Sequence, residues 1–203
     1  MICHSGVGLT PTIDGRVHHF SAAGLYNGLV LMADDETGTY WDHVTGEAVH
    51  GPLRGKVLDA WCTPITNVAA ALQDYPEIEV SISKLSLKGR LMMWSASWWK
   101  REKSVLPPFF RKTMGDADGR LPEHTHGLGV VVDGETRFYP MSRIGGGIED
   151  AWGERVLSVS IDSRDGIPQA VWADGSRPMQ LFSRWYGFAY TYRGCGIYGQ
   201  DAS

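Results

Sequence analysis

The sequence lacks several features that would assign it to a membrane, secreted or nucleic-acid-binding class. Its apolar runs all fall short of the roughly 18–20 residues needed to span a bilayer. Residues 1–10 lack the basic start and long apolar centre of a signal peptide. The net charge of −4 gives no general reason to expect nucleic acid as a partner. We therefore expect a chain that is cytoplasmic as given, with no transmembrane segment and no nucleic-acid partner.

Cysteine and complete catalytic motifs are also scarce. The three cysteines, Cys3, Cys62 and Cys195, are an odd number, so they cannot all pair within one chain, and reduced thiols are the simpler expectation. The sequence contains no Gly-x-Ser-x-Gly elbow, no His-Glu-x-x-His helix, no P-loop and no Cys-x-x-Cys pair. Function must therefore be argued from smaller clusters.

The residues that are abundant favour a sheet protein. The 203 residues include 25 glycines, 8 tryptophans and 8 tyrosines, which suits β-strands joined by many turns. A chain of this length can bury a full core. We predict a single, mainly β (α+β) domain over residues 1–203, built as an antiparallel sheet sandwich or a barrel-like domain with two or three short helices.

Periodicity and turn residues predict individual strands. Apolar residues alternate with polar ones over 78–83 and 157–162, the pattern of a strand with one buried face. Asp-Gly pairs beginning at Asp133, Asp165 and Asp174 have apolar or aromatic runs on both sides, which predicts hairpins.

Two further segments receive a secondary-structure prediction. The aromatic-rich segment 182–192 suits a final strand with a bulge at Gly187. Thr66 can cap a short helix that ends before Pro76.

A second helix is predicted over about 88–103, inside a basic segment. Leu91, Trp94 and Trp98 recur there at helical spacing. Residues 84–112 contain eight basic residues and one acid, a local charge of +7, so the remainder of the chain carries −11. We interpret 84–112 as a Trp-rich helical insertion whose tryptophans pack on the sheet. The alternative is a weak contact with an anionic surface.

The first candidate site is Cys3 with His4. A thiolate and an imidazole are ligands for copper, zinc or iron, although adjacent residues rarely point the same way in a strand. The alternative is a buried cysteine next to a surface histidine.

The second candidate site surrounds a predicted turn over 44–47. His43 and His50 would flank this turn as metal ligands, and Glu47 or Asp42 would orient an imidazole or act as a general base, with His43 and Glu47 as the catalytic pair. The alternative is a polar turn between two strands.

Other histidine pairs are less suited to a metal. His124 and His126 would share a strand face, but a solvated loop is expected there. His18 and His19 are adjacent, so on a strand they would point to opposite faces.

Three sets of residues match a known family in order and spacing. They are the segments 3–8 (CHSGVG), 24–32 (GLYNGLVLM), and 37–41 (TGTYW) with 45–55 (TGEAVHGPLRG). A later block, 128–130 (LGV) with 133–134 (DG) and 137–140 (RFYP), matches as well. The chain thus resembles the domain of unknown function 3179 family over most of its length, a resemblance that brings no established reaction.

The resemblance carries an expectation about the start of the chain. Family members typically read Cys-Pro-x-Cys, and Cys3 matches the second cysteine. The resemblance therefore implies a longer native N-terminus, a dithiol in place of a single thiol, and export if the true start lies upstream.

We keep three hypotheses for the function. The first is a metal-binding or redox-active β domain that uses Cys3, His4, His43 and His50 with copper, zinc or iron. The second is a module that binds a small ligand or protein through Tyr26, Asn27 and Trp41, with exposed aromatics such as Trp185 and Tyr186. The third is a structural or accessory protein with no site.

Overall fold

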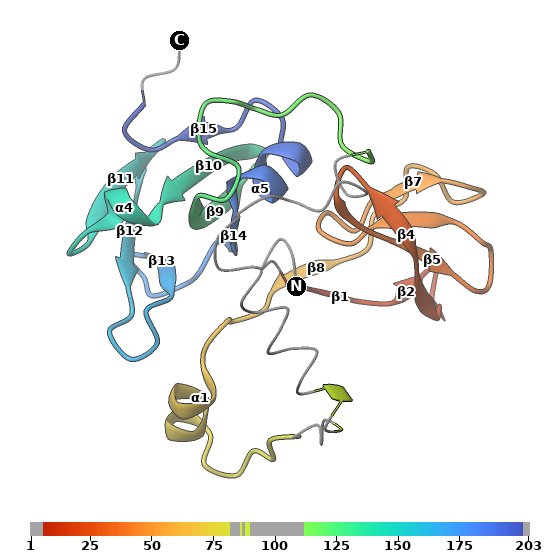
Figure 1. The fold of residues 1–203 in the computed structure, drawn as a ribbon, viewed down its shortest axis with the longest axis horizontal. Helices are drawn as coiled ribbons and strands as arrows, with labels where there is room; N and C mark the ends of the chain where they lie inside the picture. The colour runs from red at the N-terminus through yellow and green to blue at the C-terminus, as the bar shows by residue number, and fades with distance from the viewer. Residues whose placement is uncertain (1–5, 82–85, 87, 90–111, 201–203) are drawn as a thin grey trace.

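The computed structural model describes residues 6–81, 86, 88–89 and 112–200. Two groups of sheets lie on either side of a short antiparallel ribbon formed by β1 (Val7–Leu9) and β8 (Ala60–Cys62) (Figure 1). The described part is mainly β with short helices and contains no closed barrel, which confirms the predicted fold class in its sandwich form.

The N-terminal group holds one four-stranded antiparallel sheet and one small hairpin. The sheet has the order β4 (Phe20–Tyr26), β5 (Leu29–Asp34), β6 (Tyr40–Asp42), β7 (Ala48–His50), so each strand pairs with its successor in the chain. The hairpin is β2 (Thr12–Ile13) with β3 (Arg16–Val17). One face of the sheet buries Trp41 and Ala48 against Ile13 and Leu58.

The C-terminal group is a β-sandwich. Its four-stranded sheet has the order β14 (Met179–Arg184), β9 (His126–Val132), β10 (Glu135–Pro140), β15 (Gly196–Ile197). Its three-stranded sheet has the order β11 (Ile148–Trp152), β12 (Arg155–Ile161), β13 (Pro168–Trp172). All strand pairs are antiparallel except β10–β15. Two helices accompany the sandwich, α4 (Met141–Ile144) and α5 (Trp185–Thr191).

Alternation along the central strands divides the core into two layers. On β10, Phe138 points to the layer that contains α5, whereas the next residue, Tyr139, points into the layer between the two sheets. Leu157 and Val159 of β12 fill that second layer, as their alternation predicts.

The α5 layer also reaches the N-terminal group. Leu29 of β5 and Val44 from the β6–β7 turn belong to the same buried cluster as Phe138 and Trp185. Apolar burial therefore connects the two groups of sheets.

The predicted strand over 182–192 is wrong for most of its length. β14 ends at Arg184, and Trp185–Thr191 form α5, while the final strand is β15. Trp185 and Phe188 are three residues apart and both bury against Phe138, a spacing that one helix face provides. The residues between them are also buried, so the segment has no polar face to mark a helical period. Periodicity therefore does not distinguish this helix from a strand.

Two of the three predicted Asp-Gly hairpins are confirmed. Asp133 joins β9 to β10, and Asp165 lies in the turn between β12 and β13. The turn at Asp174 exists, with the N–H of Gly175 bonded to the carbonyl of Trp172 at 2.9 Å, but it is not a hairpin between neighbours. The chain changes sheet there, because β13 pairs with β12 and β14 pairs with β9.

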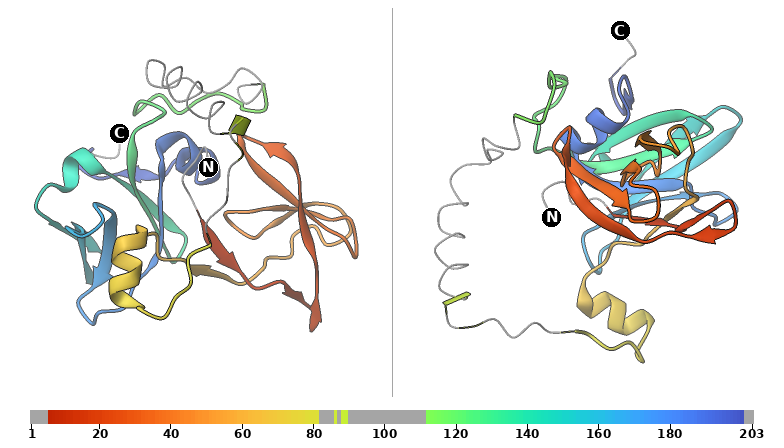
Figure 2. Two further views of the ribbon diagram at one scale, coloured as in Figure 1. Left: turned by 60° about the horizontal axis from the view of Figure 1, so that its bottom comes forward. Right: turned by 90° about the vertical axis from the view of Figure 1, so that its right-hand side faces the viewer.

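The helix predicted after Thr66 is present as α1 (Val68–Asp74), but its cap is Asn67, whose side chain accepts a 2.8 Å hydrogen bond from the Ala70 amide. Thr66 instead donates to Asp165 at 2.7 Å. This bond ties α1 to the β12–β13 turn, and the left view of Figure 2 shows the helix beside the strands of this sheet. None of the described helices is long and apolar enough to cross a bilayer.

Two further predictions fall partly or largely outside the described residues. Residues 78–81 are not a strand, and the remainder of the strand predicted over 78–83 lies outside the described part. Most of the predicted 88–103 helix and of the 84–112 insertion also lies outside it.

Candidate metal centre

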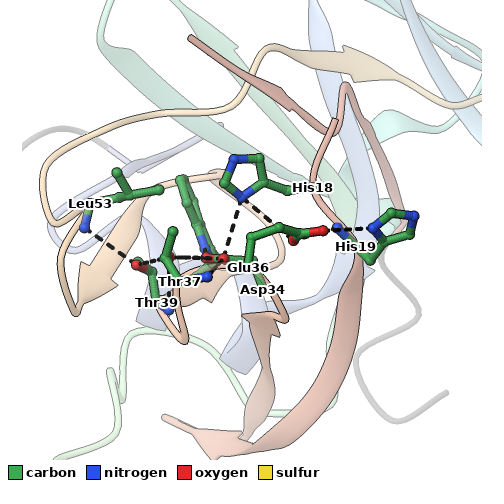
Figure 3. A network of polar contacts seen from close by, with 8 residues as sticks. His18, His19, Asp34, Glu36, Thr37, Thr39 and Leu53 are labelled. Carbon is green, nitrogen blue, oxygen red and sulfur yellow. Dashed lines mark hydrogen bonds and ion pairs between the residues drawn. The ribbon is translucent and has the colours of Figure 1, made fainter. Parts of the chain in front are cut away.

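The turn between β5 and β6 is built around the carboxylate of Asp34. This residue ends β5, and its Oδ1 accepts hydrogen bonds from the amide and hydroxyl of Thr37 at 2.6 and 2.8 Å. Its Oδ2 accepts the Nε1–H of Trp41 at 2.8 Å. Side-chain acceptors of this kind fix a turn because they replace the missing backbone partners. Figure 3 shows this network of polar contacts.

His18 reaches the same carboxylate from another segment. It lies between β3 and β4, and its backbone N–H is held by the carbonyl of Pro11 at 2.8 Å. Its side chain is only 7% exposed, and Nδ1 lies 3.3 Å from Asp34 Oδ1 and 3.7 Å from Glu36 Oε2 (Figure 3).

Glu36 is fixed in turn by His19. The Glu36 Oε1 atom lies 2.6 Å from His19 Nδ1, and Oε2 accepts the backbone N–H of His19 at 2.9 Å. The His19 side chain is 76% exposed and that of Glu36 is 35% exposed, so this side of the cluster faces solvent.

Both carboxylates of the cluster are ionised at neutral pH. Burial raises the pKa of Asp34, but the hydrogen bonds from Trp41, Thr37 and His18 together outweigh burial and hold that pKa below its usual value. The hydrogen bond from the His19 ring lowers the pKa of Glu36, and the same bond raises the pKa of His19. The Nδ1 atom of His18 therefore faces two negative charges.

The spacing of these atoms suits a metal ion. The ligand atoms of His18, Asp34 and Glu36 all lie within 4.8 Å of one another. Tetrahedral bonds of about 2.0–2.1 Å place neighbouring ligand atoms roughly 3.4 Å apart, close to the separations seen from His18 Nδ1. Among the described residues, no second set of three His, Cys, Asp or Glu side chains converges in this way.

The hydrogen bonds to Asp34 are compatible with ligation. Metal-binding carboxylates are normally oriented by such outer partners. The Thr37 hydroxyl also lies 2.6 Å from Thr39 Oγ1, which gives it a second acceptor if a metal takes a lone pair of Asp34. The cluster is thus an imidazole and two carboxylates held on a rigid turn.

The histidines predicted as ligands lie elsewhere, and Cys3 and His4 lie outside the described residues. His43 follows β6 and donates from Nδ1 to the carbonyl of Val30 at 2.8 Å. His50 pairs with Tyr40 at the opposite end of β6, so His43 and His50 are separated by three residues of strand, about 10 Å along the backbone. Neither belongs to the converging set.

The predicted turn around Glu47 is present. Asp42 Oδ1 accepts the amides of Val44 and Thr45 at 2.7 and 3.0 Å, so Asp42 serves the turn. The Glu47 amide bonds to Thr45 Oγ1 at 3.2 Å, and the residue is exposed. His43 and Glu47, the predicted catalytic pair, thus each bond a different residue in the described part of the chain, Val30 and Thr45 respectively.

The residues predicted to bind a ligand divide into exposed and buried ones. Tyr26 is 51% exposed, and Asn27 begins the β4–β5 turn with a positive φ of 50°. The expected exposure is wrong for Trp41, Trp185 and Tyr186, which are at most 2% exposed because they fill the cores.

A shallow hollow lies on the outer face of the N-terminal sheet. It is lined by Tyr26, Leu31, Tyr40, Val49 and His50. The rings of Tyr40 and His50 lie 6.1 Å apart, and Tyr40 is 37% exposed. Two predicted site residues, Tyr26 and His50, therefore share one apolar surface.

The two described cysteines are thiols in separate places. Cys62 is partly buried and donates from Sγ to the carbonyl of Gln180 at 3.6 Å. Cys195 is buried, and burial raises the pKa of its thiol to about 11. A thiol with a raised pKa is a poor nucleophile, so Cys195 belongs to the core.

Sequence reasoning missed the converging cluster for a specific reason. It treated His18 and His19 as strand neighbours, but both lie in the connection between β3 and β4, where strict alternation does not apply. Glu36 then accepts from His19 and lies near His18. A usable signal was the repeated Asp-x-x-Thr-Gly of residues 34–38 and 42–46, which marks two side-chain-fixed turns.

The comparisons with known proteins give a family but no activity. Neither a curated protein nor a solved structure matches the chain. A family model described as Protein of unknown function (DUF3179) matches residues 1–171, which contain the whole His18–Asp34–Glu36 cluster. The β9–β10 hairpin that carries one of the resembling sequence blocks also falls within this match. The chain therefore belongs to the DUF3179 family.

Proposed function

We propose that this protein is a metal-binding β domain that holds a divalent transition-metal ion between His18, Asp34 and Glu36. The observation that carries the proposal is the position of His18 Nδ1, which is buried and faces both carboxylates at 3.3 and 3.7 Å. Among the described residues, the two ionised carboxylates contact polar donors and imidazoles alone, so an ion of charge +2 would balance their charge.

The donor set favours particular ions. One imidazole and two carboxylates suit Zn²⁺ or Fe²⁺, whereas Cu⁺ prefers thiolate or thioether ligands. The exposed side of Glu36 leaves room for water or substrate as a further ligand. Three protein ligands with an open position are typical of sites in which the metal acts on a bound molecule.

The proposal is tested by metal content and affinity. Protein purified without a histidine tag should contain about one equivalent of metal, and Zn²⁺ titration of the metal-free form should give one site. Removing an outer partner of a metal ligand typically weakens metal affinity by about 10–100-fold. Replacing a ligand itself should weaken it more, so we expect His18→Gln and Glu36→Gln each to lower Zn²⁺ affinity by about 100-fold or more. The matched control is His50→Gln, which lies outside the cluster.

Three outcomes would contradict this assignment. The first is unchanged affinity in His18→Gln. The second is thermal stability that neither Zn²⁺ nor a chelator alters, which would mean that His18 simply forms a charged pair with Asp34. The third is loss of binding in Cys3→Ser or His50→Gln instead, which would support the set predicted from sequence, Cys3, His4, His43 and His50.

The hollow on the outer face supports a second candidate function, the binding of a small ligand with a flat apolar side. Tyr26 and Tyr40 expose aromatic surface there, and His50 supplies a polar group at its edge. Exposed aromatic rings are effective contacts because they bury large areas with few freely rotating bonds. Tyr26→Ala should then abolish ligand-induced shifts in the nuclear magnetic resonance signals of Tyr40 and His50.

Two further parts of the proposal rest on sequence alone. The net charge of −4 supports the absence of a nucleic-acid partner. The local charge of +7 over 84–112 supports, as its alternative role, a weak contact with an anionic surface.

A further inference from the structure

Arg184 lies against two histidines at one corner of the sandwich. It ends β14, and in the register of the sheet it sits opposite His126, the first residue of β9. Its Nε–H donates to His126 Nε2 at 3.2 Å, and its NH1 group lies 3.4 Å from His124 Nδ1. All three residues are partly buried.

The chemistry of arginine determines how the two imidazole rings meet it. A guanidinium only donates hydrogen bonds and does not lose its proton in proteins. The imidazole nitrogens that face it therefore act as acceptors. Burial lowers the pKa of His126, and the charge of Arg184 lowers it further. A metal cation between these two histidines is disfavoured because the cation of Arg184 already lies beside both.

Arg184 differs from three other arginines of the chain in its charge partners. Arg120, Arg137 and Arg164 each form an ion pair with an aspartate. In the described part of the chain, no ion pair involves Arg184, and its contacts there are the two imidazoles. A partly buried charge without a counter-charge is costly, and the two imidazoles account for only two of the five N–H groups of a guanidinium.

We propose that Arg184, flanked by His124 and His126, binds an oxyanion, namely the carboxylate or phosphate group of a small ligand. A guanidinium matches two oxygens of such a group at once, which makes these charge-assisted hydrogen bonds strong. The bound anion also offsets the repulsion that keeps His126 neutral, so the ring takes up a proton more readily and changes from acceptor to donor. This site is separate from the His18 cluster and does not depend on metal binding.

The test follows the histidine ring signals by nuclear magnetic resonance during titration with inorganic phosphate. Phosphate should raise the pKa of His126 in a saturable way, and sodium chloride at matched ionic strength should not. A parallel titration with acetate distinguishes a carboxylate site from a phosphate site, because the preferred group should act at lower concentration. Arg184→Gln removes the charge that holds the anion, so phosphate binding should weaken at least about tenfold.

The matched control is Arg177→Gln. Arg177 is exposed and bonds Gln169 at 3.0 Å, away from both histidines, so this variant should bind phosphate like the wild type. If Arg184→Gln fails to fold, Arg184→Lys serves instead. Lysine keeps the positive charge but lacks the planar guanidinium that bonds two oxygens at once, so this variant should bind phosphate more weakly than wild type. The proposal fails if chloride reproduces the phosphate effect, if no anion changes the His126 signal, or if folded Arg184 variants bind as well as wild type.

Discussion

The indole Nε1–H of Trp41 donates a 2.8 Å hydrogen bond to Oδ2 of Asp34, and both side chains are buried. This bond links the core of the N-terminal sheet to the turn that carries Glu36. The candidate metal centre is therefore built on a turn that packing holds in place. Such preorganisation is what a binding site requires, because side chains already fixed lose little freedom when a ligand arrives.

Replacing Asp34 tests how far that turn depends on its carboxylate. In Asp34→Asn the amide keeps one oxygen but presents N–H donors to Trp41 or Thr37, which are donors themselves. We expect a loss of about 3 kcal/mol in the free energy of unfolding, in the range found when a buried charged partner is removed. Urea denaturation of the metal-free protein measures it. The control is Asp35→Asn at the neighbouring exposed position, where a loss of similar size would show that charge alone matters.

Much of the fold was predictable because its signals are local. Asp133 and Gly134 have positive φ angles of 49° and 85°, the backbone geometry for which an Asp-Gly pair is suited, so the hairpin can be recognised from two letters. The strand of Leu157 and Val159 follows from alternation, because one face of β12 is buried and the other is not.

The candidate site was not predictable in the same way. His18 and Asp34 are sixteen residues apart, and they meet because β4 and β5 pair Phe20 with Asp34. That register depends on the whole sheet and its bulge. The same limit applies to Trp41, which the binding hypothesis took as an exposed aromatic but which is buried with its indole bonded to Asp34.

A second prediction concerns the junction between the two sheets of the sandwich. The side-chain amide of Gln180 on β14 accepts the Ala170 N–H at 2.7 Å and donates to the Ala170 carbonyl at 2.9 Å, so one side chain pairs with the strand β13. Gln180→Met keeps the volume but leaves two buried backbone groups without partners, and we expect a cost of about 2–4 kcal/mol. Thermal and urea unfolding should show this loss, whereas Gln169→Met, which removes a surface contact to Arg177, should change stability by under about 0.5 kcal/mol.

A third prediction concerns the contact between β9 and α5. A Cβ atom at Gly129 would lie 2.0 Å from the ring of Phe188, so only glycine lets the helix pack on this strand. We expect Gly129→Ala to cost about 1–3 kcal/mol or more, the range for overpacked cores. Gly146→Ala is the matched control, because no atom lies within 4 Å of its added Cβ. Equal stability of the two variants would mean that α5 is displaced easily.

The last prediction concerns acid sensitivity at His126. Burial and the charge of Arg184 place the folded-state pKa of this ring below its usual value of 6.5. The unfolded chain then binds more protons than the folded chain between these two values, so the free energy of unfolding falls as the pH drops below about 6.5 and is unaffected by His126 at higher pH. Urea midpoints of the metal-free protein between pH 8 and 5 measure this in chloride buffers, which avoid oxyanions.

His126→Gln should reduce the slope of the free energy of unfolding against pH below about pH 6.5, because glutamine does not titrate. The control His50→Gln alters an exposed ring outside the Arg184 contact and should leave the slope unchanged. Adding phosphate to the wild type should also reduce the slope, since a bound anion favours the protonated ring. An identical slope in wild type and His126→Gln would show that the acid sensitivity arises elsewhere and that Arg184 does not hold this imidazole neutral.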